Sequence, residues 1–317
     1  MITVLCGGVG AARILRALEL VVDPRDVTGV INTGDDTTLH GLAISPDIDT
    51  IVYTLAGAID PTRGWGLVDE TWTAMDALAR YEAVRPAGSA AAPRWFNLGD
   101  RDLATHFYRT ARLTEGATLA QVTAEIAQAW SVRERLVPMT NDRVSTLVHL
   151  GDGTTVSFQE YFVKLRHSVP VSGVTFDGAV AATLEPSASA AIEGADVLVI
   201  APSNPIVSIG PIRALPGVDD LLARRRERTV AISPIVAGAA LKGPADRMLT
   251  ELGFEASVAG VARLYAPIAS VLVIDPADAD LAGEVEAAGM RAVVTPSIMS
   301  SPEVSAELVR RTLAATR

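Results

Sequence analysis

The sequence has a single cysteine, Cys6, among 317 residues, which excludes an internal disulfide framework and fits a reducing compartment. It also lacks a basic excess, since the net charge of -10 argues against a nucleic-acid partner. No apolar run approaches the roughly 18 residues that span a bilayer. "MITVLCGG" has neither the basic start nor the cleavage site of a signal peptide. These absences predict a cytoplasmic protein that binds neither nucleic acid nor membrane.

Motifs of several common enzyme classes are missing as well. The four histidines lie far apart, at positions 40, 106, 149 and 167, without zinc-binding spacing. No G-x-S-x-G elbow and no Gly-Lys-Ser/Thr of a Walker A loop occurs. A zinc hydrolase, a serine hydrolase and a P-loop protein are therefore unsupported.

What is present is an alternation of short apolar segments and helical segments at both ends of the chain. The apolar segments include "ITVLCGG", "ADVLVIAPSNP", "RTVAISPIVAG", "SVLVIDP" and "RAVVTPSIM". This pattern predicts an α/β fold: a Rossmann-like, mostly parallel sheet with helices on both faces. We assign residues 1–61 and 171–317 to this core.

The sequence pattern changes between residues 62 and 170, where helical spacing predominates. We interpret this region as a mainly helical insertion that covers the active site. Segments such as "ETWTAMDALARYEA" and "LAQVTAEIAQAW" have helical spacing, and all four tryptophans lie here. "RPAGSAAAPR", residues 85–94, has the composition of a loop.

"GGVGAAR", residues 7–13, follows the first predicted strand and begins a helix. Glycines such as Gly8 and Gly10 allow the backbone to approach a ligand, and a helix N-terminus favours negative charge. The third glycine of the dinucleotide fingerprint is absent, because Arg13 follows the two alanines. A ligand-binding loop and a merely tight turn both remain open, and Cys6 fits a small buried residue.

"VTGVI", residues 27–31, predicts a second short strand. Four carboxylates lie close together after it: Asp35, Asp36, Asp47 and Asp49. One acid at this position would suit the ribose of a nicotinamide cofactor, but that leaves Asp47 and Asp49 unexplained. A hard cation such as Mg²⁺ prefers one or two carboxylates plus substrate phosphates. A metal or substrate site and a solvated acidic loop are the two interpretations.

Three further loops carry candidate binding residues. "APSNPIVSIGPI" offers Ser203, Asn204, Ser208 and Gly210 in a proline-stiffened loop that can cradle a phosphate. "ISPIVAGAALKGPA" follows the next strand. In "NLGDRDLATH", helix capping by Asp100 and its neighbours explains most of the pattern.

Taken together and in order, these motifs resemble the CofD/FbiA family, the 2-phospho-L-lactate transferases of coenzyme F420 biosynthesis. The resemblance rests on "GGVGAAR", "NTGDDTTLHGLAISPDIDTIVYTLAG", "DPTRGWGLVDETW", "LGDRDLATH", "PMTNDRVSTLV", "FQEYFV", "APSNPIVSIGPI" and "SPIVAGAALKGPA". These segments cover nearly the whole chain.

The resemblance implies transfer of a phosphorylated three-carbon acid from a guanosine diphosphate adduct to the deazaflavin precursor Fo, with release of GMP. It implies Mg²⁺ held by Asp36 and Asp49, which are also the catalytic residues, and it suggests a homodimer. The substrate-binding residues it implies are Gly8, Gly10, Thr33, Asp35, Trp65, Asn97, Asp100, Thr105, Ser203, Asn204, Ser208, Gly210, Ser233 and Lys242.

The sequence departs from many relatives at Thr37 and Thr38, because those relatives carry a bulky aromatic residue after the paired aspartates.

Two alternative functions remain. One is a nucleotide-binding regulator or nucleotide-sugar-binding relative of the gluconeogenesis-factor-like branch, and the other is a nicotinamide-dependent oxidoreductase. "GDRDLATH" and the tryptophans speak against the first, and the incomplete glycine fingerprint against the second. No single residue distinguishes the possible donors, but "GAIDPTRGWG" and the following "ETW" resemble actinobacterial members of the family, and this resemblance implies an enolpyruvyl donor rather than a lactyl or glyceryl one.

Overall fold

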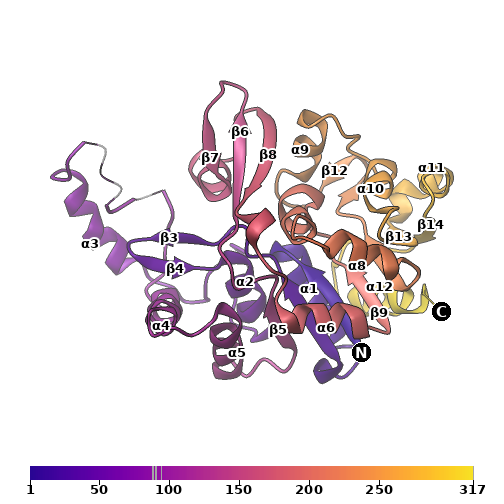
Figure 1. Ribbon diagram of the computed structural model, residues 1–317, viewed down its shortest axis with the longest axis horizontal. Coiled ribbons are helices and arrows are strands. Elements are labelled where there is room, and N and C mark those ends of the chain that lie inside the picture. The colour runs from indigo at the N-terminus through magenta and orange to yellow at the C-terminus, as the bar shows by residue number, and fades with distance from the viewer. Residues whose placement is uncertain (88, 90, 94, 317) are drawn as a thin grey trace.

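The computed structural model describes residues 1–87, 89, 91–93 and 95–316. Its centre is a parallel sheet that has seven strands within this part of the chain (Figure 1). In spatial order they are β14 (Arg291–Val294), β13 (Val271–Ile274), β10 (Thr229–Ile232), β9 (Val197–Ile200), β1 (Ile2–Cys6), β2 (Val27–Ile31) and β5 (Arg135–Pro138). All six pairings are parallel, which confirms the predicted α/β class.

The strand order reverses between β1 and β9. From β1 the chain moves outward to β2 and then β5, and later returns to β9 on the other side before continuing to β10, β13 and β14. In open α/β sheets, ligands bind in the crevice at the carboxyl ends of the strands next to such a switch point. The loops after β1, β2 and β9 are therefore the ones that line the expected site.

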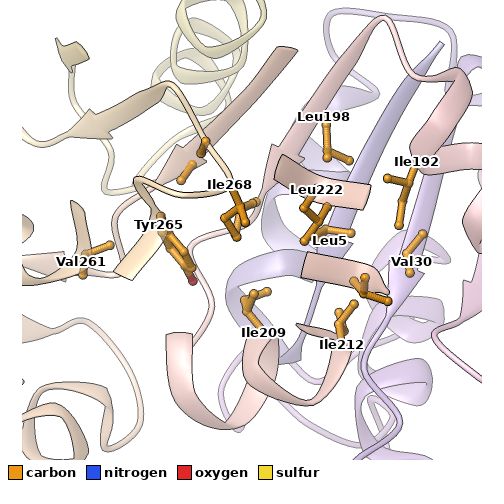
Figure 2. Close-up of a cluster of buried hydrophobic side chains, with 14 of the residues drawn as sticks. Leu5, Val30, Ile192, Leu198, Ile209, Ile212, Leu222, Val261, Tyr265 and Ile268 are labelled. Atoms are coloured by element: carbon orange, nitrogen blue, oxygen red, sulfur yellow. The ribbon is translucent and has the colours of Figure 1, made fainter. Parts of the chain in front are cut away.

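The sheet is buried on both faces because its strands are almost wholly apolar. On one face, Leu5, Val30 and Leu198 point toward Ile212 and Leu222 (Figure 2). The helices of this face are α6 (Pro186–Gly194), α7 (Gly210–Arg213), α8 (Val218–Arg224), α10 (Val258–Tyr265) and α11 (Ala282–Ala287). The opposite face is covered by α1 (Gly8–Leu18), α2 (Pro46–Leu55), α5 (Leu119–Ala129) and α12 (Pro302–Ala314). Each face has its own hydrophobic core.

Two smaller substructures flank this core. A hairpin of β3 (Thr37–Leu39) and β4 (Leu42–Ile44) packs near α3 (Thr73–Glu82) and α4 (Asp102–Thr114). An antiparallel sheet of β7 (Thr155–Ser157), β6 (Ser145–Leu150) and β8 (Val171–Asp177) stands beside α9 (Ala245–Glu251). Figure 1 shows the hairpin and α3 on the left and this second sheet at the top.

The structure corrects the predicted boundaries of the insertion. Its helices α3, α4 and α5 are present, but β5 pairs with β2 and so belongs to the main sheet. At the other boundary, β8 pairs with β6 although 171–317 was assigned to the core. Strand partners distant in sequence decide both cases, and local periodicity carries no information about partners. The loop predicted at 85–94 lies partly outside the described residues.

Within the described residues, no helix is both long and apolar enough to cross a membrane.

Candidate active site

The loops after β1 and β9 meet in close contact at the switch point. A Cβ on Gly10 would lie 2.2 Å from the carbonyl oxygen of Pro202, and one on Gly7 would lie 2.4 Å from Cβ of Ser208. The hydroxyl of Ser203 donates a hydrogen bond to the carbonyl of Gly7, at 2.7 Å. Gly7 and Gly10 therefore lie where the loop after β9 approaches too closely for a side chain. Gly8, with φ +65°, begins α1 in a conformation that favours glycine.

Several of the predicted binding residues have structural partners. Asn204 accepts hydrogen bonds from the backbone of Ile206 and so caps the π-helix η4 (Pro205–Ile209). A Cβ on Gly210 would lie 2.9 Å from the ring of Phe176. Ser233 is buried and bonds within its own turn to Ile235. These contacts shape the loops, whereas Ser208 in η4 is half-buried and faces the glycine loop.

The acidic residues come together where β2 ends and α2 begins. Asn32, directly after β2, donates from its amide to Asp47 at 2.9 Å and to Asp35 at 3.2 Å. Both carboxylates are buried, and burial raises the pKa of Asp47 to about 6 and that of Asp35 well above its usual value. Asp47 and Asp49 lie in the first turn of α2, where the helix dipole favours negative charge. The cluster is thus folded into the protein, and the interpretation as a solvated loop is wrong.

Asp36 has one occupied and one free oxygen. Its Oδ2 accepts a hydrogen bond from Ser45 at 2.7 Å, while Oδ1 is buried without a partner among the described residues. Burial raises the pKa of Asp36 to about 8, although Ser45 and Arg109 act in the opposite direction. Asp35 Oδ1 and the hydroxyl of Thr33 likewise have no described partner. Buried oxygen atoms of three residues close in sequence thus have no hydrogen-bond donor among the described residues.

Asp49 has a different environment, because a buried arginine neutralises it. Arg109 on α4 contacts both carboxylate oxygens of Asp49, with Nη1 to Oδ2 at 3.2 Å. His106, one turn earlier, places Nδ1 3.2 Å from Nη1 of Arg109 and Nε2 3.1 Å from Asp102. Tyr53 on α2 donates to the other oxygen of Asp102 at 2.6 Å. Residues 102, 106 and 109 lie on one face of α4. This helix therefore positions Asp49 through a series of contacts between buried polar side chains.

A hollow of about 190 Å³ opens beside Asp36. The β3–β4 hairpin supplies Thr37 and Thr38, and the turn after β5 supplies another wall. Its full lining is Thr33, Asp36, Thr37, Thr38, Ala43, Ile44, Ser45, Leu113, Leu119, Asn141, Asp142, Arg143 and Val144.

The predicted site residues between positions 62 and 105 lie in different environments, some exposed and some buried. Asp100 caps α3, since it accepts from the hydroxyl of Thr71 and the amides of residues 73 and 74, which lowers its pKa to about 2. Trp65 is exposed and stacks with the guanidinium of Arg63, 5.4 Å from the ring centre. Asn97 is exposed. Thr105 is buried on α4.

Lys242, another predicted binding residue, lies beside Gly64. A Cβ on Gly64 would lie 2.4 Å from its ammonium nitrogen, so the loop after β10 reaches the "DPTRGWG" loop. The two loops thereby come together although they are far apart in sequence.

The residues present are compatible with Mg²⁺. Groups of three or more His, Cys, Asp or Glu side chains in metal-binding arrangement do not occur in the described part of the chain. Mg²⁺ usually takes only one or two carboxylates, with water and substrate phosphates completing its shell. The free Oδ1 of Asp36 suits such a ligand, and each oxygen of Asp49 keeps a lone pair beyond its bond to Arg109.

Fold and site together define a doubly wound α/β protein whose ligand crevice is lined by buried carboxylates. Comparison with known proteins then gives the family. The model of the 2-phospho-L-lactate transferase CofD family matches residues 2–298, and the chain belongs to this family of transferases.

Two relatives agree with this assignment. The chain is 42% identical over 316 residues to a phosphoenolpyruvate transferase of Streptomyces griseus, covering 98% of this chain and 97% of the relative. It is 41% identical over 328 residues to a phosphoenolpyruvate transferase of Mycobacterium ulcerans, covering 98% and 96%. A crystal structure of a UPF0052-family protein of Bacillus halodurans superposes with a TM-score of 0.59 at 14% identity, covering 97% of this chain and 98% of that one. This last likeness concerns the fold alone.

Sequence reasoning missed the partners of the carboxylates: Asn32, Ser45, His106 and Arg109. The spacing of residues 102, 106 and 109 in "DLATHFYR" was the available signal, because it places three polar side chains on one helix face. Nothing in the local sequence indicated that this face meets Asp49, 60 positions away.

Proposed function

We propose that the protein transfers a phosphorylated three-carbon acid from its guanosine diphosphate adduct to the ribityl hydroxyl of Fo, in the biosynthesis of coenzyme F420. The observation that carries the proposal is the buried acidic cluster beside the two touching loops of the switch point. Membership of the CofD family supports the reaction type. The names of the similar Streptomyces and Mycobacterium proteins support an enolpyruvyl donor.

In this reaction the hydroxyl oxygen of Fo forms a bond to the phosphorus that carries the three-carbon unit. The bond from that phosphorus to the bridging oxygen breaks, and GMP leaves with the electron pair. The hydroxyl proton passes to a carboxylate of the acidic cluster. Such transfers depend mainly on in-line positioning and charge neutralisation. Mg²⁺, when held by Asp36 and Asp49, supplies neutralisation of the diphosphate.

The remaining residues divide between the two substrates. The loop after β9, with Ser203, Asn204 and Ser208, holds the guanosine nucleotide, and the glycine loop lies against the deazaflavin. Trp65, Asn97 and Thr105 enclose the flat deazaflavin, and Lys242 contacts an anionic group. We infer a cytoplasmic homodimer from the family resemblance and the acidic charge.

Asp36→Asn tests the proposed metal site. Asn retains the shape and can still accept from Ser45, so the fold should persist while most Mg²⁺-dependent turnover of Fo is lost. The assay is formation of the acidic deazaflavin product with and without Mg²⁺, and Asp26→Asn, at an exposed position, is the control. Full Mg²⁺-dependent turnover in Asp36→Asn would show that the metal assignment is wrong.

A further inference from the structure

The hollow beside Asp36 contains a single Lys or Arg among its lining residues, Arg143. Every other polar residue of the lining is neutral or acidic, and Asp36 and Asp142 are the acids. Arg143 is exposed and forms no ion pair with any residue that the structure describes. The guanidinium of Arg143 thus has no ion-pair partner among the described residues, although two acids line the same hollow.

The backbone around Arg143 is held firmly in place. Asn141 accepts a hydrogen bond from the amide of Ala120 at 2.9 Å, which ties the turn to the start of α5. Asp142 accepts from the amide of Thr183 at 2.8 Å. A Cβ on Gly178 would lie 2.5 Å from the carbonyl oxygen of Arg143, so the residue directly after β8 packs closely against the same turn. The turn is therefore fixed from three sides, while the side chain that it presents is free.

We propose that this hollow binds the three-carbon unit of the donor and that Arg143 pairs with the carboxylate of that unit. The inference rests on the proposed function. An anionic donor next to Asp35, Asp36 and Asp47 meets repulsion, and its carboxylate requires a cation that these residues do not supply. The planar fork of an arginine matches a carboxylate with two parallel hydrogen bonds.

The size of the hollow favours the three-carbon unit over the complete guanosine nucleotide and the complete Fo molecule. Sites for drug-sized ligands measure about 300–1,000 Å³, and the hollow has about 190 Å³. A three-carbon acid therefore fits in this hollow. Thr37 and Thr38 contribute to this space, because a bulky aromatic residue in their place would fill part of it.

Binding of GDP and of the lactyl guanosine diphosphate adduct, measured by calorimetry without Fo, tests the proposal. Arg143→Gln should weaken adduct binding roughly 10- to 100-fold, the usual range for a lost charged hydrogen-bond pair. GDP has no carboxylate, so its affinity should change less than about twofold. Arg143→Lys should recover part of the loss, because it keeps the charge without the fork. Arg135→Gln, at the opposite end of β5, removes the same charge far from the hollow and should change neither affinity.

A second variant tests the space rather than the charge. Thr38 is exposed, so Thr38→Trp should fold, and it should weaken adduct binding while leaving GDP binding unchanged. Unchanged adduct affinity in both Arg143→Gln and Thr38→Trp would overturn the proposal. Equal losses for adduct and GDP would also overturn it, since Arg143 would then act on the diphosphate.

Turnover by the wild-type protein separates this inference from the proposed function. Product formed from Fo, together with unaltered adduct affinity in Arg143→Gln, would contradict only the carboxylate subsite. Absence of product from wild-type protein with every adduct would remove the basis of both.

Discussion

Asp49 and Arg109 form an ion pair in which both side chains are almost completely buried, and it connects α2 to α4. Breaking a buried pair by removing one partner commonly costs about 3–5 kcal/mol, because the other charge remains buried and unpaired. The pair therefore matters for stability as well as for the position of Asp49.

We expect Asp49→Asn and Arg109→Gln each to lower the free energy of unfolding by about 3 kcal/mol. The double variant should lose at least 1 kcal/mol less than the sum of the two, since it leaves no unpaired charge. Urea denaturation measures all three. Arg311→Gln, which breaks the exposed pair with Glu307, is the control and should cost less than about 1 kcal/mol. Additive effects of Asp49→Asn and Arg109→Gln would contradict the pairing.

Glu134, just before β5, is a buried carboxylate with no hydrogen-bond partner for either oxygen among the described residues. Burial raises its pKa to about 7, and the neighbouring Glu19 adds to the increase. A raised carboxyl pKa means that the folded state keeps the proton over a pH range in which the unfolded state has lost it. Stability from this group is therefore lost as pH rises from about 4.5 through 7.

Glu134→Gln should remove this contribution. Its free energy of unfolding relative to wild type should increase by about 1–2 kcal/mol between pH 5 and pH 8. Urea midpoints at several pH values measure this difference, and Glu286→Gln at an exposed position is the control. A difference that does not change with pH would contradict the assignment.

At the scale of elements, α1 and the loop after β9 are packed so closely that Gly10 has no room for a side chain. Gly10→Ala should move the loop, lower the free energy of unfolding by about 1–3 kcal/mol and weaken GDP binding. Gly283→Ala, in α11 with nothing within 4 Å of the added carbon, is the control and should be neutral or stabilising by up to about 1 kcal/mol. Equal effects of the two substitutions would contradict the close contact.

The elements also show what the sequence could and could not predict. β1, β9, β10, β13 and β14 were predictable because each is a short, mostly apolar run bounded by turn residues. The acidic cluster was predictable because its members are close in sequence and follow a strand. The places of β5 and β8 and the contact of α4 with Asp49 were not, since they depend on partners far away along the chain. The role of Asp100 as a cap of α3 rather than of its own helix has the same cause.

At the scale of the whole molecule, the reversal of strand order brings three loops to one edge of the sheet. The glycine loop follows β1, the acidic cluster follows β2, and the loop with Ser208 follows β9. The described insertion helices add Arg109 and His106 beside Asp49. The fold thus brings anionic and cationic groups from distant parts of the chain together at one edge of the sheet.

The central claim, transfer of a phosphorylated three-carbon acid to Fo, is tested most directly by a product assay. Purified protein receives Fo, Mg²⁺ and the enolpyruvyl, lactyl or glyceryl guanosine diphosphate adduct, and deazaflavin fluorescence is followed by chromatography. We predict a new, more acidic deazaflavin product, formed fastest with the enolpyruvyl adduct. No product with any adduct, despite measurable GDP binding, would contradict the account and favour a nucleotide-binding regulator.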